Sequence, residues 1–259
     1  MNRLDQTFAG LRQSKQKALA LFLTAGFPRL DSTLRNVLMC VEAGADIIEL
    51  GMPFSDPLAD GPVIQRSSAA ALDNGMNVNR LFSQVSEIRK RTDVPIVLMG
   101  YVNPVLQYGI QKFHSEAVDA GVDGLIFPEV PLEGMKFVTG SERRSNLAHV
   151  MLVAPTTPSE RIARIDLASK GFVYCVSTTG VTGAKSQNGN ETYLRRVRNN
   201  VTRNPVLIGF GISTGTDIEL VIKWSDGVII GSALIKRLEE AKSLRSISSW
   251  IHGLKKSLQ

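Results

Sequence analysis

The chain has 259 residues, of which 43% are hydrophobic and 21% charged, a balance typical of a globular protein with a sizeable core. Its apolar runs, such as 228–230, are far shorter than the roughly 20 residues that a membrane-spanning helix needs. The N-terminal segment carries charges throughout and lacks the apolar stretch of a signal peptide, so the sequence predicts a cytoplasmic protein.

The chain carries 30 basic and 24 acidic residues, a net charge of +6. The basic residues form short clusters, such as 195–198 and 255–256, and aromatic residues are not interleaved with them. This pattern is more typical of solvated helix faces than of a nucleic-acid surface, so no nucleic-acid partner is expected. A mild positive balance also suits an anionic, phosphorylated substrate.

Cys40 and Cys175 are the only cysteines. Cys40 falls in a helical pattern and Cys175 in an apolar run, so both are expected to be buried small side chains. No cluster of His, Cys and carboxylate residues has metal-ligand spacing, and the sequence predicts no metal site.

Eight short apolar runs alternate with segments of helical spacing along the chain. The runs are continuously apolar, which is typical of parallel strands that are covered on both faces. We expect these strands at 18–24, 46–50, 95–99, 122–127, 148–153, 172–176, 205–209 and 226–230.

Glycine and proline mark the ends of the helical segments. Pro62 suits a first helical position, and a helical run from Asp31 stops at Gly44. Gly44, Gly121 and Gly171 each come one or two residues before an expected strand, so each is predicted to form the left-handed C-cap of a helix.

Eight strand and helix units in one uninterrupted chain predict the α/β class and a (β/α)8 TIM barrel as a single domain over 1–259. Extra N- and C-terminal helices are expected at 2–13 and 243–257. A doubly wound open sheet is the alternative. It would usually carry a glycine-rich fingerprint after its first strand, where this chain reads TAGFPRLD.

The segment 49–65, ELGMPFSDPLADGPVIQ, follows the second expected strand and concentrates carboxylates. Glu49 lies inside an apolar run, where an unpaired carboxylate is costly to bury, and Asp56 and Asp60 lie in a proline-rich loop. Two carboxylates in different surroundings suit acid and base chemistry, because burial raises the pKa of one while solvent keeps the other ionised.

Each of these carboxylates also has a structural interpretation. Glu49 could line the barrel in an ion pair with a lysine or arginine. Asp60 could cap the helix that starts at Pro62, and Asp56 could be a turn residue.

The three histidines are poorly placed for catalysis. His114 and His252 fall on expected helices, and His149 opens the fifth strand at the opposite end of the barrel from the catalytic face. Acid and base work at the catalytic face therefore falls to carboxylates or to tyrosines such as Tyr101 and Tyr174.

The segment 177–190, STTGVTGAKSQNGN, is long, small and polar, which favours a mobile lid over a plain surface loop. After the seventh and eighth strands come GFGIST at 209–214 and GSALIK at 231–236. Their glycines let backbone N–H groups approach an anion, Ser232 adds a hydroxyl, and the following helix directs its positive end inward. We favour a phosphate site at these two loops over glycines that merely end strands.

The segment 49–65 resembles the hallmark of the tryptophan synthase alpha chains, ELGxPFSDPxADGPxIQ. The similarity continues over essentially the whole length in the family order. It includes FLTAGFP at 22–28, LMGYVNP at 98–104, APTTPSERI at 154–162, STTGVTGA at 177–184, GFGIS at 209–213 and GSALIK at 231–236.

This resemblance implies a retro-aldol cleavage of indole-3-glycerol phosphate to indole and glyceraldehyde 3-phosphate, in tryptophan biosynthesis. Glu49 and Asp60 fall on the family's two catalytic acids: Glu49 would shuttle protons, and Asp60 would hydrogen-bond the indole N–H. The residues implied around the indole are Phe22, Ile64, Tyr101, Leu125, Ile126, Phe127 and Tyr174. Those implied for the phosphate and lid are Thr182, Gly183, Phe210, Gly211, Gly231 and Ser232.

The resemblance also implies a partner, a beta subunit that holds pyridoxal phosphate and receives the indole, in an alpha2-beta2 tetramer. The alpha chain itself would hold no cofactor. Two positions depart from the common family pattern. The segment 128–131 reads PEVP where the family usually has PDLP, so Glu129 replaces an aspartate near subunit-coupling contacts, and Thr178 stands where some relatives carry a larger or charged residue.

Three other functions are weighed against this one. A sugar-phosphate isomerase would share the phosphate loops but would not need the segment 49–65. A non-catalytic barrel that only activates a partner would be expected to lack one of the two acids, and this chain keeps both. A stand-alone indole-releasing lyase would act without a beta subunit.

Overall fold

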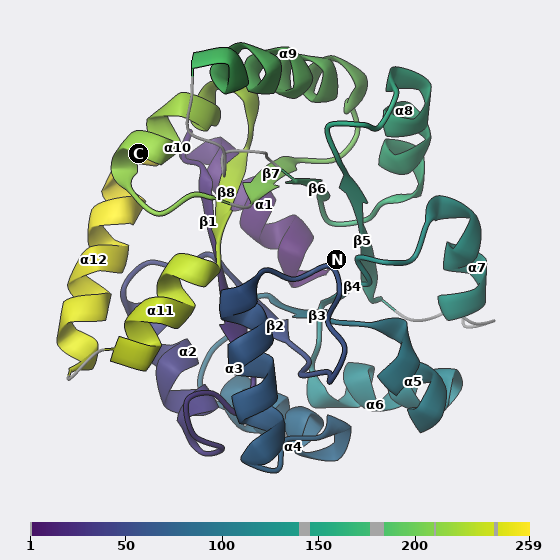
Figure 1. The fold of residues 1–259 in the computed structure, drawn as a ribbon, viewed down its shortest axis with the longest axis vertical. Helices are drawn as coiled ribbons and strands as arrows, with labels where there is room; N and C mark the ends of the chain where they lie inside the picture. The colour runs from purple at the N-terminus through teal and green to yellow at the C-terminus, as the bar shows by residue number, and fades with distance from the viewer. Residues whose placement is uncertain (1, 140–145, 177–183, 210, 241–242) are drawn as a thin grey trace.

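The computed structural model describes residues 2–139, 146–176, 184–209, 211–240 and 243–259 and forms a closed parallel barrel (Figure 1). Eight strands pair in chain order, and β8 closes onto β1. The strands are β1 Ala18–Thr24, β2 Ile47–Gly51, β3 Ile96–Met99, β4 Gly124–Ile126, β5 Ala148–Val153, β6 Val173–Val176, β7 Val206–Gly209 and β8 Gly227–Ile230. The prediction of a (β/α)8 barrel is confirmed, and the doubly wound alternative is wrong.

Helices surround the barrel and bury its outer face (Figure 1). They are α1 Arg3–Gln13, α2 Ser32–Glu42, α3 Pro62–Asp73, α4 Val78–Arg89, α5 Val102–Tyr108, α6 Ile110–Ala120, α7 Met135–Val138, α8 Ser159–Ala168, α9 Ala184–Asn200, α10 Gly215–Val221, α11 Ser232–Glu240 and α12 Leu244–Lys256. Two short 3₁₀ turns, η1 Leu132–Gly134 and η2 Ile222–Trp224, complete the set. No helix among the described residues is long and apolar enough to cross a membrane.

The core lies inside the barrel and between the strands and the helices. Most strand residues are buried, because each strand has side chains on both faces and both faces are covered. The predicted terminal helices are present as α1 and α12. Helix α1 packs across the end of the barrel where the strands begin: Leu4 is fully buried there, and Phe8 packs against Phe172.

Two predictions about the connections are wrong. Helix α8 ends at Ala168 with an extended C-cap at Ser169, so Gly171 is not a helix cap. A β-carbon at Gly171 would lie 3.0 Å from Leu4, so the close approach of α1 is one reason for a glycine there. Helix α9 begins at Ala184, so the irregular segment predicted through residue 190 ends earlier.

The last seven residues of that predicted loop, 184–190, are helical for a physical reason. Tyr193, Leu194 and Val197 recur at helical spacing and are buried, and this apolar face stabilises a helix whose first turns are polar. The rest of the predicted lid, with Thr178, lies outside the described residues.

Candidate active site

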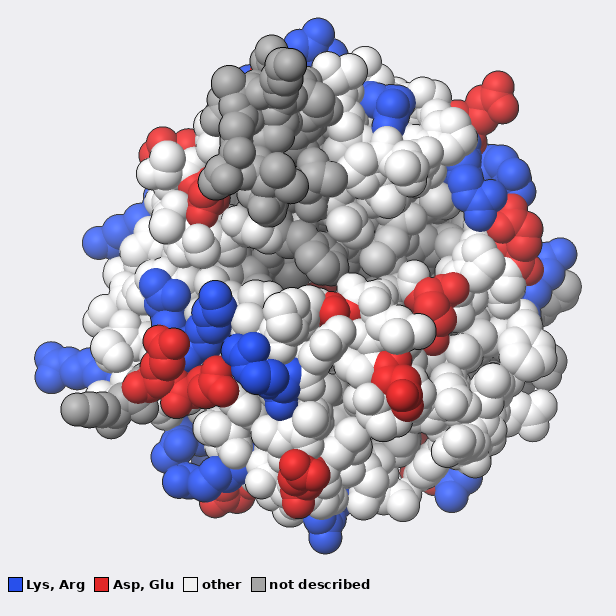
Figure 2. All heavy atoms as spheres, in the orientation of Figure 1, with Lys and Arg blue, Asp and Glu red and all other residues white. Residues whose placement is uncertain are grey.

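A cavity of about 400 Å³ opens at the carboxyl ends of the strands. Figure 2 shows a hollow near the centre of this face, with basic and acidic side chains intermixed beside it over α3 and α11. The cavity is lined by Phe22, Glu49, Asp60, Ile64, Met99, Tyr174, Gly211, Ile212, Ser213, Ile229, Gly231, Ser232, Ala233, Lys236 and Arg237. Its volume falls in the usual range of small-molecule sites.

Glu49 lies on β2 and its side chain reaches the cavity from a fully buried position. It pairs in register with Phe22 of β1, another cavity residue. Neither carboxylate oxygen has a hydrogen-bond partner among the described residues, and no described cation forms an ion pair with it. Burial raises the pKa of Glu49 from 4.5 to about 8. Glu49 is therefore mostly protonated at neutral pH, and the structural interpretation as a paired acid fails for the described part of the chain.

Asp60 lies in the loop between β2 and α3 and is half-buried. The hydroxyl of Tyr101 donates to its Oδ2 at 3.2 Å and accepts the N–H of Ala59 at 2.8 Å. Burial raises the pKa of Asp60, the Tyr101 hydrogen bond opposes that rise, and the nearby charge of Glu129 adds to it. Gly61 is the N-cap of α3, so the alternative in which Asp60 caps this helix is wrong.

Asp56 lies apart from this cavity. Its side chain is exposed and accepts a hydrogen bond from the neighbouring Ser55 hydroxyl, and its backbone oxygen accepts the N–H of Leu58. These are the contacts of a turn residue. The loop thus presents only one of its two aspartates to the cavity.

Aromatic rings form two walls of the cavity, and glycines make room for them. A β-carbon at Gly51 would lie 2.5 Å from the Phe22 ring, and one at Gly209 would overlap the ring and hydroxyl of Tyr174. Gly51 was not singled out from the sequence, and Gly209 was noted only among the glycines of the predicted phosphate loop at 209–214. The sequence could have indicated this packing role, because each glycine ends a strand beside a strand that carries an aromatic residue.

Two more apolar predictions have different outcomes. Ile64, on the first turn of α3, lines the cavity. Ile126 is fully buried at the end of β4, in register with the cavity residue Met99, but it does not itself line the cavity. Tyr101 lines a small adjoining hollow that shares Phe22 and Asp60 with the main cavity.

The opposite end of the cavity suits an anion. Gly231 and Ser232 stand at the start of α11, whose first N–H groups have no partner within the helix. The N–H groups of an α-helix start and their positive dipole end favour negative charge. Gly211 lies at the same end and adopts φ +76°, a left-handed conformation that favours glycine.

Some donors near this end are already used. The carboxylate of Asp217 accepts the N–H and hydroxyl of both Ser213 and Thr214, which fixes the turn before α10. Lys236 and Arg237 line the cavity from α11 and were missed in the sequence. The spacing of 232, 233, 236 and 237 places them on one face of that helix, which is the signal that could have found them.

Other predicted residues lie elsewhere. Thr182, Gly183 and Phe210 fall outside the described residues. The rings of His114 and His149 stack on each other with their centroids 5.5 Å apart, and neither lines the cavity. His252 is exposed on α12. No group of three or more His, Cys, Asp or Glu residues that could hold a metal occurs in the described part of the chain. Cys40 and Cys175 are both free and buried.

A parallel barrel with a buried neutral carboxyl, a second carboxyl in a loop and a helix start facing them is typical of TIM-barrel enzymes that act on small phosphorylated substrates. The sequence model of the tryptophan synthase alpha chain matches residues 8–254. The chain belongs to the tryptophan synthase alpha chain family. This is a lyase family of tryptophan biosynthesis, and the alpha-chain reaction is the cleavage of indole-3-glycerol phosphate.

The similarity covers the whole chain. It is 44% identical over 264 residues to the tryptophan synthase alpha chain of Thermoanaerobacter sp. (strain X514), with 100% of both chains covered. It is 42% identical to that of Geotalea daltonii, with 98% of each covered. Among solved structures, the alpha subunit from Legionella pneumophila superposes with a TM-score of 0.91 at 34% identity, covering 100% of this chain and 98% of that one. A chain of Mycobacterium tuberculosis tryptophan synthase gives 0.89 at 32% identity, with 100% of both covered.

Proposed function

We propose that residues 1–259 act as one catalytic domain that cleaves indole-3-glycerol phosphate with Glu49 and Asp60 as its two acids. The observation that carries this assignment is Glu49, a fully buried carboxyl with a pKa near 8 on the wall of the cavity. A carboxyl that holds its proton at neutral pH can act as a general acid.

The cavity suits a substrate with an aromatic ring at one end and a phosphate at the other. The indole ring would lie between Phe22 and Tyr174, near Ile64. The phosphate would lie at Gly211, Gly231 and Ser232, where the start of α11 stabilises its charge. Thr182, Gly183 and Phe210 stay proposed phosphate and lid residues, and Ile126 a proposed support beneath the ring.

Asp60 would accept a hydrogen bond from the indole N–H. As the ring carbon is protonated, positive charge develops on this nitrogen, and a carboxylate beside it stabilises that charge. Tyr101 holds Asp60 in place through its hydroxyl, which also ties down the backbone at Ala59. Asp60 therefore needs no rearrangement when the charge develops.

Glu49 would move two protons. Its carboxyl first gives a proton to the ring carbon that bears the side chain, which leaves Glu49 as a carboxylate. The carboxylate then takes the proton of the adjacent side-chain hydroxyl as the carbon–carbon bond breaks. Indole leaves with the first proton, the hydroxyl carbon becomes the aldehyde of glyceraldehyde 3-phosphate, and Glu49 is again protonated.

We also propose that the partner is a tryptophan synthase beta subunit, in an alpha2-beta2 tetramer that binds pyridoxal phosphate in the beta chain only. The exposure of Leu58 supports a contact of the beta subunit near the site: this apolar residue is 91% exposed on the loop that carries Asp60. A partner that covers Leu58 would hold this loop. Leu58→Ser should weaken binding of a beta subunit in calorimetry and leave the melting temperature unchanged. Unchanged affinity would place the contact elsewhere.

The reaction is tested by indole release from indole-3-glycerol phosphate, with and without a beta subunit. Glu49→Gln should lower turnover by about 10²- to 10⁴-fold, the usual contribution of a general acid or base. It should still bind glyceraldehyde 3-phosphate in calorimetry. Glu42→Gln makes the same chemical change at an exposed site on α2 and should keep full activity.

The same experiment separates the alternative functions. Near-normal turnover of Glu49→Gln would remove Glu49 from the mechanism. Activity that needs no beta subunit would indicate a stand-alone lyase. Phosphate binding without any indole release by the wild-type chain would favour an isomerase or a non-catalytic barrel.

A further inference from the structure

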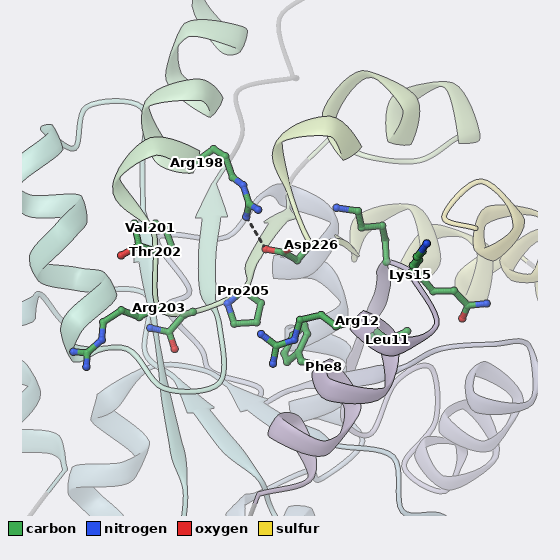
Figure 3. A pocket seen from close by; sticks show the side chains of 13 residues that line it. Phe8, Leu11, Arg12, Lys15, Arg198, Val201, Thr202, Arg203, Pro205 and Asp226 are labelled. Carbon is green, nitrogen blue, oxygen red and sulfur yellow. Dashed lines mark hydrogen bonds and ion pairs between the residues drawn. The ribbon is translucent and has the colours of Figure 1, made fainter.

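A second large cavity, of about 570 Å³, lies at the opposite end of the barrel from the candidate active site. Its walls come from α1, from the segment between α1 and β1, from the end of α9 and the segment between α9 and β7, and from the residue before β8 (Figure 3). All of these elements lead into the beginnings of strands, whereas the candidate active site lies at the strand ends. The two cavities share no lining residue.

Positive charge dominates this basal cavity. Arg12, Lys15, Lys17, Arg198 and Arg203 line it, and Asp226 is its one acidic residue. Figure 3 shows the ion pair of Arg198 with Asp226, whose atoms are 3.0 Å apart, and shows Arg12 extending from α1 toward the Pro205 side. Lys17 donates to the backbone oxygen of Ser225 at 2.6 Å.

Three of the cations have neither kind of contact, and all three are exposed. Within the described residues, Arg12, Lys15 and Arg203 form no ion pair and no side-chain hydrogen bond. They come from two chain segments almost 200 residues apart in sequence, and Figure 3 shows the Arg203 side chain extending away from Arg12. Like charges gathered around a hollow repel one another, so an anion bound between them relieves that repulsion.

The lining also contains an apolar surface. Phe8, Leu11 and Val201 line it and are themselves largely buried, and Pro205 adds a partly exposed ring. Phe8, Leu11 and Val201 expose little apolar area, so the ring of Pro205 is the part that a ring-bearing ligand can cover, which removes apolar area from water on both sides. Inorganic anions gain nothing from it, so the cavity distinguishes an organic anion from a simple one.

The rim on the α9 side is fixed in place before any ligand binds. The carboxylate of Asp166 accepts the N–H groups of Thr202, Arg203 and Asn204 at 2.8, 2.9 and 3.0 Å. The pKa of Asp166 is lowered: burial raises it, but these hydrogen bonds and that of the Asn204 side chain together lower it by more than burial raises it. A rim held this way loses little conformational freedom when a ligand binds.

We propose that the basal cavity binds a small organic anion, one that carries a phosphate or carboxylate group and an apolar ring. The anionic group contacts Arg12 and Lys15 and draws the Arg203 side chain toward it, and the ring lies on Pro205. The volume is within the range of small-molecule sites. This site is separate from the proposed lyase chemistry and does not depend on it.

The test uses the full-length ¹⁵N-labelled chain titrated with 1-naphthyl phosphate and, separately, with inorganic phosphate, followed by backbone amide shifts. Amide shifts give the location directly, which matters because an aryl phosphate can also enter the active site. The variant is Arg12→Glu with Lys15→Glu. Its matched control is Arg91→Glu with Lys256→Glu, which reverses two exposed cations outside the cavity, one of them again in a last helical turn.

We expect saturable shifts over residues 8–17 and 201–205 with naphthyl phosphate, and weaker binding of inorganic phosphate there. The double variant should bind at least about tenfold more weakly at this site, since the loss of one charge-assisted hydrogen bond alone corresponds to such a change. The control should bind as the wild type does.

Three outcomes would overturn the proposal. Shifts confined to residues 211–213 and 231–237 would mean that only the active site binds the probe. Equal affinities of the double variant and its control would remove the cations from the site. Displacement of the probe by a poly-aspartate peptide at much lower concentration would make this face a surface for an acidic macromolecule instead.

Discussion

Replacing Glu49 by glutamine should stabilise the protein, and increasingly so as the pH rises. Glu49 is fully buried, and neither of its oxygens has a partner among the described residues. The folded chain therefore holds the Glu49 proton more tightly than the unfolded chain does: the pKa of Glu49 is about 8, against an ordinary value of 4.5. Glutamine has almost the same shape and cannot ionise, so the variant isolates the energetic cost of this one charge.

The sign and size follow from proton binding. Between pH 4.5 and 8 the unfolded chain has lost the Glu49 proton while the folded chain keeps it, so the contribution of this group to stability is complete below pH 4.5 and is lost as the pH rises toward 8. One pH unit inside this window corresponds to about 1.4 kcal/mol. The full window therefore carries about 5 kcal/mol as an upper bound, and roughly 3 kcal/mol of it is lost by pH 7.

The measurement is urea unfolding of wild type and Glu49→Gln at pH 5, 6.5 and 8. The difference between the two free energies of unfolding cancels other titrating groups, such as His149, whose pKa burial lowers to about 4. We expect that difference to move in favour of the variant by several kcal/mol from pH 5 to pH 8. Glu42→Gln, at an exposed position, should show a constant difference. A pH-independent difference for Glu49→Gln would refute the reasoning, because it would mean that Glu49 ionises in the folded chain as readily as in water.

Two further substitutions test the walls of the same cavity. Tyr101→Phe removes the hydroxyl that donates a hydrogen bond to Asp60. The rate of indole release should fall about tenfold to a hundredfold, because losing a hydrogen bond to a charged group costs about 1–3 kcal/mol. Retention of full kcat would mean that Asp60 needs no such support. Gly51→Ala places a methyl group 2.5 Å from the Phe22 ring and should cost about 1–3 kcal/mol in thermal unfolding. Gly253→Ala, inside α12 with open space around it, should not lower the melting temperature, and equal losses in the two variants would contradict this packing.

The barrel could be predicted because its strands are buried on both faces. Runs such as 95–99 and 205–209 are continuously apolar for that reason, and the helix signals between them are clear. Strand ends do not follow from this pattern: β4 spans only Gly124–Ile126, although 122–127 is all apolar or small except Asp123. Asp123 is buried before that strand and accepts hydrogen bonds from Arg89 and from the backbone of Ile96, contacts that no local pattern reveals.

The candidate site could be predicted only in part. The position of Glu49 in an apolar run indicated a buried carboxyl, but the sequence could not show whether a distant lysine or arginine pairs with it. Tyr101 lies 41 residues from Asp60, and their hydrogen bond exists because the ends of β2 and β3 are neighbours in the barrel. Lys236 and Arg237 were missed because they lie one turn into α11, beyond the loop where barrel sites are usually sought.

The different surroundings of the two acids determine the order of proton transfers in the proposed mechanism. Burial raises the pKa of Glu49 with no described hydrogen bond to oppose it, whereas the rise at Asp60 is opposed by Tyr101. Glu49 therefore enters the cycle as an acid and protonates the ring carbon first. The carboxylate left behind has no described donor to stabilise it, so it is a strong base and recovers its proton from the substrate hydroxyl. The same burial that destabilises the fold at high pH thus supplies the driving force for the second transfer, and the site ends the cycle in the protonation state in which it began.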